Sequence, residues 1–130
     1  MVKDKIPDYY DTLIRTLKTL YNGKFSHTRV YDDSPASFPH IYMKRLKSTD
    51  IMQTQNGVIH GVENAVEISA YHNEGISEAE EWSDLIKKIM TDVQYGINLK
   101  CTYYQQIDNT ADSSIIRFVM RFEGKTTEVE

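Results

Sequence analysis

The residue types that could do metal or acid–base chemistry are spread along the chain and form no recognisable motif. The four histidines are His27, His40, His60 and His72, and no two of them are spaced i, i+4 on a predicted helix or close in sequence to Cys101. Zinc and iron sites need such clusters of nitrogen and sulfur ligands. We therefore expect no metal site, no cofactor and no catalytic residue.

The carboxylates fall into three groups, and each group has a structural explanation. Asp32 and Asp33 lie in a predicted turn, residues 78–84 load the start of a predicted helix with negative charge, and Asp108 opens a polar loop. Spacing alone does not show whether such acids converge in one cleft. A small cytosolic enzyme that uses Asp32, Asp33 or the Asp108 loop therefore stays open as an alternative.

Charged residues on two predicted strands suit contacts between proteins. Arg117 and Arg121 are expected on the outward face of one strand, and Glu63 and Glu67 on the outward face of another. These charges can pair within one subunit or across two subunits. We favour the interface, because exposed pairs within a subunit contribute only about 0–1 kcal/mol, whereas charges between partners set their register.

Tyrosine is frequent, with nine copies in the chain. Tyr42 and Tyr71 are expected opposite the buried faces of their strands, where tyrosine commonly anchors interfaces. Together with nearby basic residues and a predicted turn, they complete the candidate interface. Its members are Tyr42, Lys44, Arg45, Lys47, Gln55, Asn56, Gly57, Glu63, Glu67, Tyr71, Arg117 and Arg121.

Two amphipathic helices are expected to position these residues. Apolar residues recur every three to four positions over 10–21, after Pro7 in a first-turn position and before a closing Gly23. The second helix has a capping box in which Ser77 caps the first turn and Glu80 reaches back.

The predicted strands are a short one at 28–31, the two arms of a long hairpin, and two strands at the end of the domain. The hairpin arms run over 40–54 and 58–72, joined at Asn56-Gly57, the strongest short hairpin signal. Its register stays open, with a bulge near Gly61 as one solution. The distal part, 49–61, is too polar to lie wholly over a core and can project as an arm. The strand from Leu99 places Cys101, Tyr103 and Ile107 on its apolar face, and 115–122 forms the last strand.

The resulting order is α-β-(long β-hairpin)-α-β-β. It predicts an α+β fold in which a mostly antiparallel sheet carries two amphipathic helices packed on one face. We expect residues 1–130 to be a single domain, with an ordered core over 7–124 and a loose polar tail over 125–130.

Composition narrows the class of partner. The net charge of −4 argues against a general nucleic-acid binder, although a mildly acidic wall suits a protein past which DNA slides. The single cysteine excludes an internal disulfide and fits a reducing compartment or a virion built in a cytoplasm. No apolar run is long enough to cross a membrane.

Several segments together resemble a known family. They are DTLIRTLKTLYNG, FPHIYMKRL, GVENAVEISAYHNEG, SEAEEWSDLIKKIM and SSIIRFVMRFEG. In these segments, and in its length and element order, the chain resembles the tail-terminator or tail-completion proteins of long-tailed bacteriophages, often labelled minor capsid proteins in phages of Gram-positive hosts. The resemblance covers about residues 7–124 and lies in the pattern of elements, without a diagnostic motif.

The resemblance implies a structural virion protein without catalytic residues. Its subunits would form a homo-hexameric ring at the head–tail interface, assembled in the host cytoplasm. Such a ring caps the tail tube, binds the tail-tube protein and a head-completion or connector protein, and lets DNA pass through its lumen. Two further alternatives remain: a head-completion or stopper protein, and a small cytosolic adaptor domain.

Overall fold

The computed structural model describes residues 8–31, 35, 37–53, 59–108 and 114–127. Side chains are described over the same residues except 47–53, 59–63 and 125–127. The elements are α1 (Tyr9–Leu20), β1 (Ser26–Thr28), β2 (His40–Gln53), β3 (Ile59–His72), α2 (Ile76–Thr91), the short 3-10 helix η1 (Val93–Tyr95), β4 (Lys100–Asp108) and β5 (Ile116–Thr127).

The predicted α+β class is confirmed, and the five strands form one sheet in the order β1-β2-β3-β5-β4. The strands from β2 to β4 pair antiparallel. However, β1 pairs parallel with β2, so that Ser26 lies beside His40, and the sheet is mixed. The connection over 29–39 makes this possible, because a parallel neighbour needs a long crossover, whereas a tight turn gives an antiparallel one.

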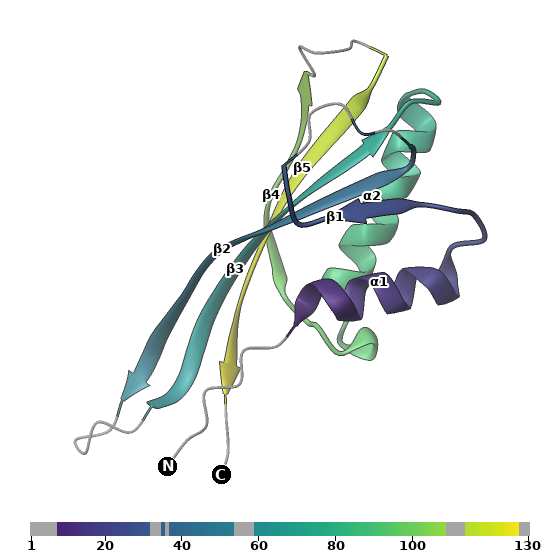
Figure 1. The fold of residues 1–130 in the computed structure, drawn as a ribbon. Helices are drawn as coiled ribbons and strands as arrows, with labels where there is room; N and C mark the ends of the chain where they lie inside the picture. Colours follow the sequence, from purple (N-terminus) through teal and green to yellow (C-terminus); the bar gives the residue numbers. More distant parts are fainter. Residues whose placement is uncertain (1–7, 32–34, 36, 54–58, 109–113, 128–130) are drawn as a thin grey trace.

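Both helices cover the same face of the sheet (Figure 1). Trp82 of α2 lies where the layers meet: its ring contacts Tyr21 edge-on at 5.0 Å, and its Nε1 donates to the carbonyl oxygen of His40 at 3.2 Å. The fully buried side chains between the helices and the sheet include Leu13, Leu17, Ile41, Ile68, Ile86, Ile89, Met90, Met120 and Phe122.

The helix ends differ from the predicted ones. Asp8 caps α1, with its carboxylate accepting from the Asp11 amide at 3.0 Å, and α1 ends at an extended Tyr21, so that a left-handed Gly23 is not needed. The capping box predicted at Ser77 is wrong. Helix α2 begins directly after Gly75, whose φ of 112° few other residues adopt, and the cap makes no side-chain hydrogen bond.

Bulges set the register of the long hairpin. Arg45 pairs with Val66, and extra residues at Leu46 and Ile51 of β2 shift the strand twice. A third shift, at His60 of β3, lies beside Gly61, where a bulge was expected. The predicted turn at 56–57 falls outside the described residues.

A further bulge changes the faces of β4. Cys101 pairs with Phe122 and Tyr103 with Arg121, which leaves Thr102 as an extra residue. The prediction that Tyr103 and Ile107 share the face of Cys101 is therefore wrong, because one inserted residue reverses the alternation that follows it.

The sheet is much longer than the helical layer that covers it. The fourteen residues of β2 and of β3 each span about 46 Å, whereas the sixteen residues of α2 span about 24 Å. The distal backbone of the hairpin therefore extends past both helices (Figure 1). Strand β5 accompanies it, because residues 125–127 pair with 61–63. The loose tail predicted over 125–130 is therefore wrong for 125–127, while 128–130 lie outside the described residues. We call 47–53, 59–63 and 125–127 the arm.

Two leucines of α1 provide a matched test of the buried layer. Leu17 is fully buried, whereas Leu20, three residues later, is 44% exposed. We expect Leu17→Ala to lower the free energy of unfolding by about 2–5 kcal/mol, because it removes buried methyl groups and leaves a cavity. Leu20→Ala should cost less than about 1 kcal/mol. Urea unfolding followed by circular dichroism measures both, and equal losses would contradict the packing.

Candidate functional site

The sheet face opposite the helices carries a row of charges. Arg121 of β5 donates from Nε to Oε2 of Glu67 at 2.9 Å, and Lys44 of β2 lies beside Glu67 on the other side. The Arg121 guanidinium also lies 5.0 Å from the ring centre of Tyr103. We call this face, from Lys44 through Glu67 and Arg121 to Tyr103, the free face. Arg121 and Glu67 thus pair within one subunit, whereas pairing across two subunits was the favoured expectation.

Arg117 also belongs to this side of the sheet, but it has aromatic and hydroxyl partners. Its Nε and Nη2 donate to the hydroxyl of Ser69 at 3.3 and 3.1 Å. Its guanidinium lies 5.5 Å from the ring centre of Tyr71 and 6.0 Å from that of Tyr31. Cation–π contacts of this kind hold an arginine in place without neutralising its charge.

Tyr42 and Tyr71 do not form an exposed aromatic anchor. Tyr42 is 9% exposed and Tyr71 is fully buried, and they pack with Ile115 and Phe38 in a second apolar cluster. Tyr31 contacts Tyr42 edge-on at 5.8 Å. The expectation that both rings are available to a partner is wrong, because the chain that leads into β2 folds over them.

Of the other predicted interface residues, two lie in the arm, one lies on the helix-covered face, and three lie outside the described residues. Gln55, Asn56 and Gly57 lie outside the described residues. Lys47 and Glu63 contribute described backbone to the arm, while their side chains lie outside the description. Arg45 shares the helix-covered face with its neighbour Val66.

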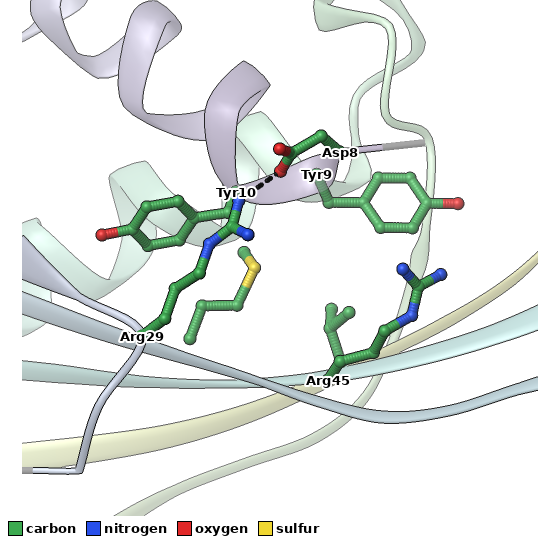
Figure 2. Close-up of a pocket in the computed structure, with 7 residues that line it drawn as sticks. Asp8, Tyr9, Tyr10, Arg29 and Arg45 are labelled. Atoms are coloured by element: carbon green, nitrogen blue, oxygen red, sulfur yellow. Dashed lines mark hydrogen bonds and ion pairs between the residues drawn. The ribbon is translucent and has the colours of Figure 1, made fainter. Parts of the chain in front are cut away.

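On that side the N-terminal turn of α1 and the sheet border an open cavity of about 220 Å³ (Figure 2). Arg29 and Arg45 reach toward the helix from opposite sides of the cavity, and Tyr9 extends over it on the side of Arg45 (Figure 2). The lining residues are Asp8, Tyr9, Tyr10, Arg29, Met43, Arg45 and Val66.

Arg29 is neutralised within the cavity. Its Nη2 lies 2.6 Å from Oδ1 of Asp8, and its guanidinium stacks 4.4 Å from the ring centre of Tyr10. The hydrogen bond from Arg29 holds the pKa of Asp8 below its usual range. Burial raises the pKa of Tyr10, whose hydroxyl lies 2.5 Å from Nδ1 of His27. These contacts tie the start of α1 to the end of β1.

Arg45 is held differently. Its Nη2 donates to Oδ1 of Asn64 at 2.7 Å, and Asn64 is fully buried. A buried amide on an apolar face is costly unless its polar atoms are bonded. In the sequence, Asn64 is the one polar residue among the alternating apolar residues Val62, Val66, Ile68 and Ala70, and this exception marks the side of the sheet on which the cavity lies. The pairing of Asp8 with Arg29 had no such sequence signal, because they lie 21 residues apart.

The groups around the cavity suit the binding of a charged or hydrogen-bonding partner. Two guanidinium groups and one carboxylate surround the cavity, and these groups recognise anions and hydrogen-bonding partners. Asp108 is exposed at the end of β4 and does not line the cavity, while Asp32 and Asp33 lie outside the described residues. Among the described residues, no three His, Cys, Asp or Glu side chains are grouped to hold a metal ion.

The described helices include none that is both long enough and apolar enough to cross a membrane. The chain was also compared with models of known protein families and with curated protein sequences, and it matches none of them.

Asp8 allows a test of the α1 side of the cavity. Asp8→Ala should lower the free energy of unfolding by about 1 kcal/mol at pH 7, because it removes the helix cap and the partner of Arg29. The pKa of Asp8 is lowered from 3.8 in the folded state, so its charge-dependent stabilisation is complete above pH 3.8 and is lost as the pH falls through the folded-state pKa.

The control for this prediction is Asp8→Asn, which keeps a capping oxygen but removes the charge. It should cost less than Asp8→Ala at pH 7, and its cost should shrink in acid. Denaturant unfolding at a series of pH values measures both variants. A cost of Asp8→Asn that stays constant down to pH 2 would contradict the ion pair.

Proposed function

We propose that the chain is a ring-forming structural subunit of a bacteriophage tail, a tail terminator that caps the tail tube and joins it to the head connector. The arm is the observation that carries the proposal. It is long, it extends past the helices that form the core with the sheet, and three strands build it. Such a segment contributes little to the stability of its own subunit and is long enough to contact another subunit.

The free edge of β2 supports association of subunits. Strand β1 pairs only with the first three residues of β2, and in the described part of the chain the outer edge from Met43 to Gln53 has no strand partner. Unpaired backbone groups along such an edge are a template for pairing with another chain. The opposite edge of the sheet is β4, so each subunit presents two different edges.

Two different surfaces on one subunit are what a ring requires. Contacts between unlike patches close into a ring when the rotation between neighbours fits, whereas a two-fold dimer uses one patch twice. The arm and the free face, with its alternating Lys44, Glu67 and Arg121 charges, are such a pair of patches. A net charge of −4 is compatible with a lumen through which DNA passes without being held.

Native mass spectrometry and tube binding test the proposal together. We expect a closed oligomer, six subunits in the ring that the resemblance implies, and binding to the ends of tubes made from the tail-tube protein of the same phage. Added to growing tubes, the chain should stop their elongation. The order of genes provides a further check, since terminator genes lie between head-completion and tail-tube genes.

The other outcomes separate the alternatives. A ring that binds DNA-filled heads and ignores tube ends would support a head-completion protein instead. A chain that stays monomeric at every concentration and binds neither tubes nor heads would contradict the proposal.

A further inference from the structure

We propose that the outer side of α2 in one subunit packs against the free face of a second copy of this chain, so that the acidic first half of α2 meets the basic residues of that face. The inference deepens the proposed function, on which it rests, by naming the residues of one contact between neighbouring subunits. It uses three observations: the charge of α2, the charge of the free face, and the opposite sides of the subunit on which the two lie.

The outer side of α2 is acidic. The first nine residues of the helix carry four acidic side chains, and the first basic residue follows at Lys87. The four are Glu78, Glu80, Glu81 and Asp84, which we call the acidic patch, and all of them are exposed. The helix dipole accounts only for Glu78, the acidic residue of the first turn, since its effect fades beyond that turn. Among the described residues, none of the four pairs with a basic side chain.

The free face has the opposite charge. Among the described side chains, this side of the sheet carries four basic and two acidic residues, whereas the whole chain has a net charge of −4. They are Lys44, Lys100, Arg117, Arg121, Glu67 and Glu123. Glu67 is already paired with Arg121, while Lys44 and Lys100 make no ion pair within the described part of the chain. These two lysines are therefore available to the carboxylates of a neighbour.

Each surface also has an apolar group beside its charges. Ile76 at the start of α2 is 43% exposed and lies one helical turn before Glu80. On the free face the half-buried Tyr103 ring lies against Arg121, and its hydroxyl donates to Oε1 of Gln105 at 2.6 Å. Apolar groups with a charged rim, tyrosine among them, are the usual composition of a protein–protein contact.

The two surfaces lie on opposite sides of one subunit. Helix α2 packs on the helix-covered face of the sheet, and the free face lies on the other side (Figure 1). They therefore cannot meet within one subunit, and one copy must offer its helix to the free face of the next. This head-to-tail contact between unlike patches is the kind that closes into a ring. It adds to the contact of the arm, because α2 and the arm belong to the same subunit.

A second basic surface would give a different assembly. Lys18, Lys24 and His27 line a shallow cavity near the end of α1, on the same side of the sheet as α2. If the acidic patch bound these residues, two copies would face one another through the helical layer, as in a two-fold dimer. The free face is favoured because only a contact between opposite sides continues around a ring.

Charge reversal in the full-length chain tests the contact. Lys44→Glu with Lys100→Glu, and separately Glu80→Lys with Glu81→Lys, should each weaken association about tenfold or more, because like charges then face one another. The matched control, Lys18→Glu with Lys24→Glu, should leave association unchanged. Analytical ultracentrifugation and native mass spectrometry measure association, and thermal unfolding shows that each variant is folded. If only the control variant loses association, the acidic patch binds the helical side and the proposal is overturned.

Restoring the complementarity shows whether these two surfaces meet. The two reversed variants should assemble when mixed in equal amounts, since in a ring with an even number of subunits every reversed surface then meets one of opposite charge. A single chain that carries all four changes should also assemble alone. Folded variants that fail in both experiments would overturn the proposal.

The size of the assembly separates this contact from the ring itself. Open chains or dimers of the wild type that respond to charge reversal and to its rescue as described would contradict the ring and support the contact. Rings that form equally well from the wild type and from both reversed variants would overturn the contact and leave the ring standing. Association should also weaken as NaCl rises from about 0.1 to 1 M, because the screening length falls from about 10 to about 3 Å. Association that is insensitive to salt would contradict the contact.

Discussion

The structure depends on a mismatch of length between its two kinds of element. A strand advances more than twice as far per residue as a helix, so helices of 12 and 16 residues cannot cover strands of 14. The proximal half of the sheet is packed under α1 and α2, and the distal half becomes the arm (Figure 1). Because β5 continues to Thr127, the arm is a three-stranded sheet and not a bare hairpin, which limits the directions in which it can bend.

The charged residues on the two faces of the sheet make different contacts. On the free face, Glu67 and Arg121 satisfy one another, and exposed pairs of this kind add little stability. On the helix-covered face, a fully buried Asn64 holds Arg45 at the rim of a cavity. The hydrogen bond from Arg45 satisfies the amide oxygen of Asn64, which would be costly to bury without a partner.

Local signals were enough to predict both helices, the long hairpin and the α+β class. They were the spacing of apolar residues for the first helix, the acidic first turn for the second helix, and Asn56-Gly57 for the hairpin. The wrong predictions have two physical causes: contacts between residues far apart in the sequence, and single residues inserted into strands. The bulge at Thr102 reversed the faces of β4, and the parallel pairing of β1 requires the crossover over 29–39. Tyr42 and Tyr71 were placed on the correct side of the sheet, but no local pattern shows that Tyr31 and Phe38 fold over them. The cavity between α1 and the sheet was not predicted from the sequence.

Electron cryomicroscopy of the assembled oligomer, at a resolution that traces backbone, tests the central claim most directly. The account predicts that the arm leaves the body of its own subunit and contacts the neighbouring one, while α1 and α2 stay packed on the proximal half of the sheet. An arm that folds back onto its own helices, or that points into solvent with the subunits joined through the helical layer, would contradict it.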